Sequence, residues 1–282
     1  MGTLYVVGTP IGNLEDMTFR AVRILREVRL IAAEDTRTAR ILLAHFDIHT
    51  PVTSYFEHNK LIKLEAILEA LVGGDVALIS EAGMPGLSDP GYELIKAALE
   101  AGHPVVPVPG PVAAVTALVV SGLPTDRFLF LGFLPRRQSE RRRLLASVAA
   151  EPGTLVAYEA PHRLCQALSD IAEVLGDRPI AVAEELTKRF ESVWRGRVSE
   201  AVTRFQVESP RGEYTLVIGG APRDAKVGAW PAERLKSALR VLLAEGLSPA
   251  AAVRILSKLT GEPHRSIYRM ALEIRSQAVM EA

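Results

Sequence analysis

The stretch VALISEAGMPGLSDPG, residues 76–91, decides the predicted fold. Its first five residues, 76–80, are apolar up to a closing serine, which predicts a strand buried on both faces of a parallel sheet. The eleven residues that follow are rich in glycine, proline and carboxylates, and they are many more than a turn requires. We therefore expect this loop to have a second task besides connecting a strand to a helix.

The segments around this stretch alternate between strand and helix patterns. Apolar runs predict further strands at 4–8, 30–33 and 105–108, and 52–56 predicts a weaker one, with helices at helical spacing between them. Asp89 and Pro90 have the residue types of a helix start, the aspartate as the cap and the proline at the first helical position. The alternative for Asp89 is a residue of the site, and a cap is favoured. Repeated strand–helix units predict right-handed crossovers and a mostly parallel sheet.

A second α/β unit is predicted after about residue 125. Its candidate strands are 127–133, 154–158, 179–184, 192–196 and 214–219, and its candidate helices are 139–150, 162–175 and 198–206. Short strands that alternate with short helices indicate a mixed sheet.

A polar linker and a helical tail complete the chain. Ser248 has the residue type of a helix cap, and the sequence around 261–266 resembles the turn of a helix-turn-helix. The predicted fold class is therefore α/β, with two consecutive α/β domains and a small α-helical tail. The predicted boundaries are 1–115, 116–222 and 223–282.

Composition excludes several classes of protein. The 33 Lys and Arg residues balance 33 Asp and Glu residues, so any contact with RNA must come from local patches. Cys165 is the only cysteine, which excludes an internal disulfide and a cysteine-built zinc site. The first residues have no signal-peptide core, and the apolar run 112–123 is too short to span a bilayer. We expect a cytoplasmic protein without membrane attachment.

Three loops rich in glycine and proline leave predicted strands of the first sheet, at 8–13, 80–91 and 107–114. In open parallel sheets, ligands bind beyond the carboxyl ends of the strands. None of these loops has the pattern of a nicotinamide-binding fold or a P-loop. Rigid loops with exposed main-chain groups predict a polar small molecule bound largely by the backbone. The alternative is that they are plain turns of a compact fold.

Several long motifs occur in a fixed order: TPIGNLEDMTFRAVRILREVRLIAAEDTR (9–37), LISEAGMPGLSDPG (78–91), PVPGPVAAVTAL (107–118), SGLPTDRFLFLGFLPRR (121–137) and YEAPHRL (158–164). In these motifs, and over roughly residues 3–220, the chain resembles the bacterial 16S ribosomal RNA cytidine 2′-O-methyltransferases. These enzymes belong to the tetrapyrrole-methylase fold superfamily. The tail resembles the helical C-terminal extension of the same family more loosely.

This resemblance implies a homodimer that binds S-adenosylmethionine (SAM) in a cleft between its two α/β domains. It also implies methyl transfer to the 2′-hydroxyl of a cytidine in the decoding region of 16S ribosomal RNA, with the 30S subunit rather than DNA or a membrane as partner. The residues that it implies for the cofactor are Pro10, Glu81, Gly83, Met84, Val112, Ala113, Ala114, Tyr158 and Thr215. The family pattern has aspartate where this chain has Glu81 and a hydroxyl side chain where it has Met84.

Methyl transfer from SAM needs no metal, but the ribose proton must be taken up by some group. The candidate catalytic residues are Asp35, Glu159 and Lys188. Asp35 and Glu159 each have a structural alternative, and the role of Lys188 depends on its burial. Asp35 has the position of a helix cap, and Glu159 has the spacing of an ion pair with Arg163. Lys188 follows a strand end, where burial would lower its pKa.

A basic run after Pro135 is the candidate RNA surface, because arginine pairs with phosphate bidentately. The alternative is a solvated helix face. The candidate RNA-binding residues are Arg37, His58, Arg136, Arg137, Arg141, Arg142 and Arg163.

Two other functions compete with RNA methylation. A SAM-dependent enzyme of the same fold could methylate a corrinoid or another small molecule, but the arginine run and the helical tail argue against it. A non-catalytic RNA-binding assembly factor is the second alternative, and the three loops argue against that one.

Overall fold

The computed structural model describes residues 1–56, 60–89, 91–222, 230 and 232–280. The chain packs as two compact units. Residues 1–146 and 153–219 form the larger unit, and residues 147–152 and 220–282 form the smaller one.

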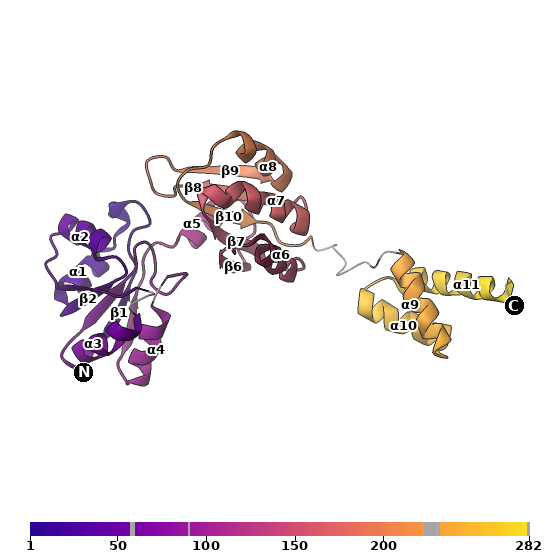
Figure 1. Cartoon of the computed structure of the whole chain (residues 1–282), viewed down its shortest axis with the longest axis horizontal. Coiled ribbons are helices and arrows are strands. Elements are labelled where there is room, and N and C mark those ends of the chain that lie inside the picture. Colours follow the sequence, from indigo (N-terminus) through magenta and orange to yellow (C-terminus); the bar gives the residue numbers. More distant parts are fainter. Residues whose placement is uncertain (57–59, 90, 223–229, 231, 281–282) are drawn as a thin grey trace. The chain divides into compact units, whose positions relative to one another are not determined.

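The larger unit contains two sheets, and the first is fully parallel (Figure 1). Its strands are β1 (Leu4–Val7), β2 (Leu30–Ala33), β3 (Val52–Ser54), β4 (Val76–Ile79) and β5 (Val105–Val108), in the order β3-β2-β4-β1-β5. Leu4 of β1 pairs with Val76 of β4 on one side and with Val105 of β5 on the other. The prediction of a parallel sheet is confirmed, and β4 is buried along its whole length.

Helices cover both faces of this sheet. They are η1 (Leu14–Asp16), α1 (Phe19–Glu27), α2 (Thr36–His45), α3 (Lys60–Val72) and α4 (Tyr92–Glu100). Successive strand residues point to opposite faces, so Tyr5 packs in the core beneath α1 and α2, while Leu4 packs in the core beneath α3 and α4. Thr18 and Asp35 cap α1 and α2 with their side chains.

The predicted start of α4 is wrong. Its N-cap is Gly91, which has a φ of 146° and makes no side-chain cap. Asp89 is therefore not a cap, although the residue pattern suggested one. Its carboxylate lines a cavity instead.

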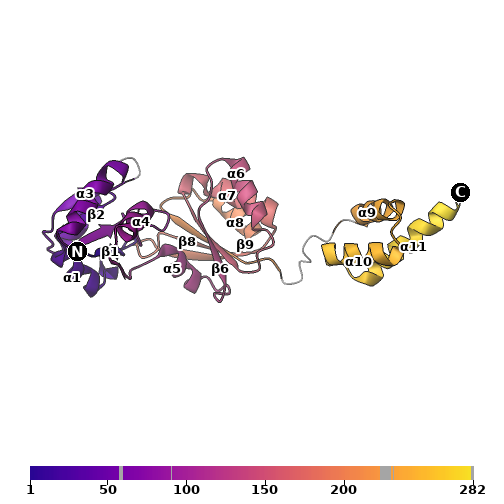
Figure 2. The same ribbon diagram turned by 90° about the horizontal axis from the view of Figure 1, so that it is seen from below.

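The second sheet is mixed, as predicted. Its strands are β6 (Phe128–Phe133), β7 (Thr154–Glu159), β8 (Pro179–Glu184), β9 (Ser192–Arg197) and β10 (Tyr214–Ile218), in the order β6-β7-β10-β8-β9. Only the β6–β7 pair is parallel within this sheet. Its helices are α5 (Ala113–Val120), α6 (Gln138–Ser147), η2 (Pro161–Arg163), α7 (Leu164–Leu175) and α8 (Val198–Val207). Figure 2 shows α5 on one side of the sheet and α6, α7 and α8 on the other.

The helix α5 connects the two sheets. It follows the loop after β5, and its residues Ala117 and Leu118 pack with Val156 and Val217 of the second sheet. The boundary predicted after residue 115 falls inside this helix.

The basic run at the start of α6 is not a uniform exposed surface. Arg141 is fully buried, and its Nη2 lies 2.6 Å from Asp170 Oδ2 on α7. The prediction that Arg141 contacts RNA is therefore wrong, because its charge is neutralised inside the protein. Arg142 is only partly exposed and pairs with both Asp170 and Glu173. Its assignment to RNA loses support for the same reason.

The smaller unit is a three-helix bundle of α9 (Ala232–Ala244), α10 (Pro249–Thr260) and α11 (His264–Met280). Ser248 caps α10 by accepting from the N–H of Ala251, and Gly261 ends it with a φ of 67°. The bundle core includes Leu239, Val253 and Ile267. Among the described residues, no helix is both long and apolar enough to cross a membrane.

Asp170→Ala would leave the buried Arg141 without its carboxylate. We expect it to lower the free energy of unfolding by about 3–5 kcal/mol, because an uncompensated charge would remain in the interior. Urea unfolding measures this change. Glu173→Ala is the matched control, since it removes an exposed partner of Arg142 and should cost at most about 1 kcal/mol. Equal costs for the two variants would contradict the prediction.

Candidate functional site

Three loops at the carboxyl edge of the first sheet pack into one body. Thr9 and Gly83 exchange backbone hydrogen bonds of 2.9 and 3.1 Å, which joins the loop after β1 to the loop after β4. Gly8 lies against Gly110 of the loop after β5. A Cβ at residue 8 would lie 2.7 Å from Gly110 Cα and 2.7 Å from Met84 Sδ. The sequence prediction that these loops share one edge is confirmed by these contacts.

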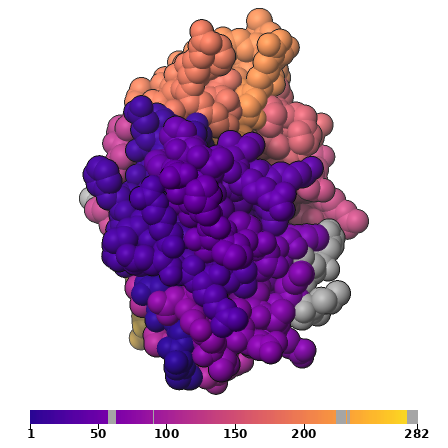
Figure 3. Space-filling view, turned by 90° about the vertical axis from the view of Figure 1, so that its left-hand side faces the viewer, coloured from indigo at the N-terminus to yellow at the C-terminus, as the bar shows by residue number. Residues whose placement is uncertain are grey.

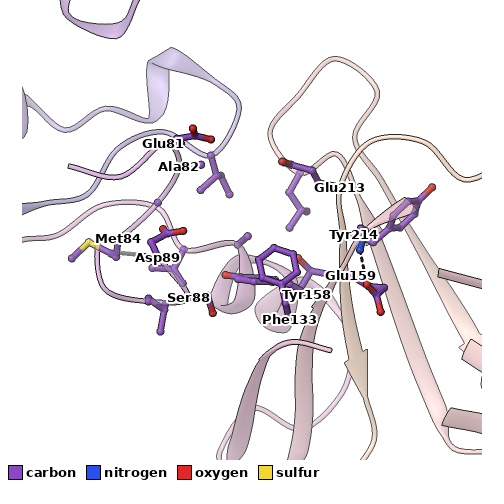
Figure 4. Close-up of a pocket in the computed structure, with 18 of the residues that line it drawn as sticks. Glu81, Ala82, Met84, Ser88, Asp89, Phe133, Tyr158, Glu159, Glu213 and Tyr214 are labelled. Atoms are coloured by element: carbon purple, nitrogen blue, oxygen red, sulfur yellow. Dashed lines mark hydrogen bonds between the residues drawn. The ribbon is translucent and has the colours of Figure 1, made fainter. Parts of the chain in front are cut away.

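A cavity of about 460 Å³ lies beyond this edge, within the size range of small-molecule sites (Figure 4). Both sheets line it. The first-sheet side contributes residues 81–84, 87–89, 112 and 113 with Ile11 and Glu34, and the second-sheet side contributes residues 158–162 and 213–215 with Phe133 and Leu186. The stretch 76–91 therefore supplies one wall of the cavity.

Seven of the nine residues predicted for the cofactor line this cavity: Glu81, Gly83, Met84, Val112, Ala113, Tyr158 and Thr215. The other two do not. Pro10 is buried behind the wall, where its neighbour Ile11 makes the contact with the cavity. Ala114 donates its backbone N–H to Tyr158 Oη at 3.1 Å, so it positions a lining side chain. That these residues bind a cofactor stays a prediction.

Tyr158 is held firmly in the cavity wall. Its ring contacts Phe130 and Phe133, with ring centroids 5.0 and 5.3 Å apart. Burial raises the pKa of Tyr158, and the nearby Asp89 acts in the same direction, while the hydrogen bond from Ala114 opposes both. The phenol therefore stays protonated and can donate a hydrogen bond to a ligand.

Three carboxylates gather on the first-sheet side of the cavity. Glu34 Oε2 accepts a hydrogen bond of 3.4 Å from the N–H of Glu81, and burial raises the pKa of Glu34. Burial, and next the charge of Glu34, raise the pKa of Asp89 to about 6, although a hydrogen bond with Ser80 opposes the shift. Figure 4 shows Glu81 and Asp89 on the side of the cavity that faces Tyr158 and Glu213. Grouped negative charge of this kind favours a cationic ligand.

Asp35 does not lie among the residues that line this cavity. Its carboxylate accepts from the backbone N–H of Arg37 and pairs with the Arg37 guanidinium, with Nη2 2.6 Å from Oδ2. These contacts lower the pKa of Asp35 to about 2. The geometry contradicts its assignment as a base, because so stable a carboxylate takes up a proton poorly.

Glu159 lines the cavity, but its carboxylate points to the opposite face of the sheet. Its Oε1 lies 2.5 Å from Nη2 of Arg163, whose Nη1 donates to the carbonyl of Leu134 at 3.1 Å. In Figure 4 the Glu159 carboxylate lies beyond Tyr158 as seen from Asp89, as alternation along β7 requires. This pair supports the structural alternative for Glu159, whose catalytic role stays a prediction, and it argues against Arg163 as an RNA contact, because that guanidinium is paired and mostly buried.

The prediction for Lys188 is also wrong. Its Nζ lies 2.9 Å from Glu185 Oε1 and 2.9 Å from Glu213 Oε2. Burial acts against its charged form, but these two hydrogen bonds outweigh it and raise the pKa of Lys188. A lysine held as a cation in this way cannot act as a base near neutral pH.

The remaining RNA candidates divide into two groups. Arg37, Arg136 and Arg137 are exposed, as an RNA contact requires. His58 lies outside the described residues.

The sequence prediction leaves three carboxylates of the cavity, Asp89, Glu34 and Glu213, out of the site. For Asp89 it favours a helix cap over a site residue, because the aspartate precedes a proline. A signal was present in the spacing, since Glu34 follows β2 and Asp89 lies in the loop after the neighbouring strand β4. Carboxylates placed after adjacent parallel strands meet at one edge.

Comparisons with known proteins agree with this architecture. The family model described as Tetrapyrrole (Corrin/Porphyrin) Methylases matches residues 3–202, and the model described as RsmI C-terminal HTH domain matches residues 228–275. The "Ribosomal RNA small subunit methyltransferase I" of Synechocystis sp. is 48% identical over 279 residues, which cover 98% of this chain and 99% of that protein. The Bacillus subtilis protein of the same name is 43% identical, over 95% of this chain and 93% of its own length.

A solved structure supports the fold alone. The uroporphyrin-III C-methyltransferase from Thermus thermophilus, complexed with S-adenosylhomocysteine, matches with a TM-score of 0.54 and 23% identity. The match covers 78% of this chain and 97% of the other. With the near-complete likeness to the two bacterial relatives, these findings lead to one conclusion. The chain belongs to the tetrapyrrole (corrin/porphyrin) methylase family, in the group of ribosomal RNA small subunit methyltransferases I.

Proposed function

We propose that this chain is a SAM-dependent methyltransferase of small-subunit ribosomal RNA, and that it methylates the 2′-hydroxyl of a cytidine in the decoding region. The observation that carries the proposal is the cavity that faces Glu34, Glu81 and Asp89 on one side and Tyr158 on the other. Family membership supports the ribosomal substrate. The choice of the cytidine and its ribose oxygen rests on the motif resemblance.

The cavity fits SAM in its size and charge. When bound, SAM supplies a methyl group on a sulfonium cation, which is the electrophile of the reaction. The backbone of residues 81–84, with Val112, Ala113 and Thr215, would hold the cofactor. Carboxylates of Glu34, Glu81 and Asp89 complement its positive charge.

Asp89 is the best-placed group to take up the ribose proton. It lines the cavity, faces Tyr158, and has a pKa of about 6, which leaves it ionised and moderately basic at neutral pH. Tyr158 keeps its proton and can donate a hydrogen bond that orients the ribose. This assignment replaces Asp35, Glu159 and Lys188.

The charge distribution supports an RNA partner. Residues 220–282 carry ten Lys and Arg against six Asp and Glu, whereas the rest of the chain carries 23 against 27. Arg265 and Arg269 are exposed in the first turns of α11. A basic helical module in a neutral chain is the footprint that phosphate binding requires. A 30S subunit in the cytoplasm is the partner that we infer.

Exposed apolar surface supports a homodimer. The helix α5 is apolar on nearly all sides, which is typical of a buried helix, yet one side is exposed. The edge strand β6 also exposes apolar side chains. The exposed residues on the two elements are Val115, Val119, Val120, Phe128, Leu129 and Phe133. Light scattering should therefore give the mass of two chains.

Methyl transfer tests the function directly. We expect the protein, incubated with labelled SAM and 30S subunits from a strain lacking the modification, to place label on one ribose 2′-oxygen. Mapping of the labelled nucleotide should identify a cytidine of the decoding region. SAM binding without transfer to RNA would favour a small-molecule substrate, and label on a base would contradict the proposed oxygen.

The pH dependence tests the role of Asp89. The value of kcat/KM for SAM should rise with pH through about 6, as Asp89 loses its proton in the free enzyme. Asp89→Asn should remove this rise and lower kcat by about 10²- to 10⁴-fold, the usual share of a general base. An unchanged profile in the variant would exclude Asp89 as the base.

Thermal unfolding provides a control for folding. The pKa of Asp89 is raised above 3.8, so its stabilising contribution is full below that pH and is lost as pH rises through about 6. Asp89→Asn should therefore gain stability relative to wild type at pH 8 but not at pH 4. Asp35→Asn is the comparison variant, for which the opposite change in stability at pH 8 is expected. The pKa of Asp35 is lowered to about 2, so its stabilisation is present above pH 3.8 and this variant should lose stability at pH 8.

A further inference from the structure

The loop between β8 and β9, residues 185–191, lies at the rim of the cavity. Leu186 lines the cavity at one end of this loop. Lys188 packs over Gly12 of the loop after β1, so closely that a Cβ on Gly12 would lie 2.4 Å from Lys188 Cγ. Figure 3 shows the orange part of the chain against the indigo N-terminal residues along the upper edge of this view. The 185–191 loop therefore adjoins the site without forming its floor.

Phe190 projects from this loop into solvent, with 75% of its surface exposed. The guanidinium of Arg189 lies 5.5 Å from the centre of the Phe190 ring. Arg189 is exposed and makes no ion pair with any residue in the described part of the chain. One aromatic face and one unneutralised cation are thus presented side by side.

The conformation of the loop is fixed despite its exposure. Glu185 and Thr187 have φ values of 50° and 66°, which side chains other than glycine adopt at a cost. Lys188 holds Glu185 through its ion pair, and Glu191 accepts from the backbone N–H of Thr187. Strained backbone of this kind persists only where surrounding contacts determine it. The Phe190 ring is therefore carried outward by an ordered segment.

We propose that Phe190 stacks on an unpaired RNA base beside the target nucleotide, while Arg189 contacts a neighbouring phosphate. This inference rests on the proposed RNA substrate. An RNA strand that brings a ribose hydroxyl into the cavity must also cross its rim, where the ring is exposed. Unpaired bases are recognised by stacking on aromatic side chains and arginine, and every base offers the required face.

The test uses the full chain, and a fluorescein-labelled single-stranded oligocytidylate of 12 nucleotides is the probe. Phe190→Ala should weaken binding about 5- to 100-fold, since stacking on an aromatic ring contributes in that range per base. Phe190→Trp should retain or increase the affinity. Phe190→Leu should bind more weakly than wild type. Arg189→Gln should reduce the slope of log affinity against log salt by about 0.7, the value for one phosphate contact on a single strand.

Two controls isolate the contribution of the Phe190 ring to RNA binding. Val207→Ala changes another exposed apolar residue and should leave RNA affinity unchanged. SAM affinity, measured by calorimetry, should stay at the wild-type value in every variant. Equal RNA affinity of wild type and Phe190→Ala, or full rescue by Phe190→Leu, would overturn the inference. A change from dimer to monomer in Phe190→Ala would also overturn it, because the ring would then be a contact between two copies.

Failure of the stacking inference can be distinguished from failure of the proposed function. If wild type transfers no methyl group to 30S subunits, the proposed function fails whatever Phe190 does. If wild type methylates 30S subunits and Phe190→Ala does so with an unchanged KM, only the stacking inference fails. We expect a raised KM for 30S subunits with little change in kcat.

Discussion

The site depends on the close approach of three backbone loops at one edge of the first sheet. Gly8 and Gly110 touch, and Thr9 and Gly83 pair through their main chains, so the loops after β1, β4 and β5 have one shared geometry. No side chain fits between Gly8 and Gly110. Because the cavity wall is built on this contact, the positions of Glu81 and Asp89 follow from it. The length of the loop after β4 is explained in the same way: it packs against two neighbours and presents carboxylates to the cavity.

Much of the fold could be predicted from the sequence because its signals are local. Continuous apolar runs located the strands to within a residue or two, and Thr18, Asp35 and Ser248 cap helices as their residue types suggest. Asp89 shows where local reasoning fails. An aspartate before a proline is a good cap in general, but here Gly91 is the N-cap and the Asp89 carboxylate faces a cavity assembled from distant segments.

The site could be predicted in part, and most of the errors concern charged residues. The motifs placed seven cofactor candidates on the cavity, since each motif keeps its residues together. Charged residues are harder to predict, because their charge state depends on partners, and some of these partners are remote in sequence. Arg141 is neutralised by Asp170, and Lys188 is neutralised by Glu185 and by Glu213. Sequence spacing does not reveal the pairs with Asp170 and Glu213, so the basic run is predicted as surface and the paired lysine as a base.

The most direct test of this account is SAM binding to Gly8→Ala, measured by calorimetry. The added methyl would lie 2.7 Å from Gly110 and must push the loops apart, so we predict at least about a tenfold loss of affinity in a folded protein. Gly122→Ala is the control for general destabilisation: its φ of 78° strains an alanine, but a Cβ there meets nothing within 4 Å and the residue does not line the cavity, so SAM affinity should stay at the wild-type value. Wild-type SAM affinity in Gly8→Ala would contradict the claim that the packed loops form the cofactor site.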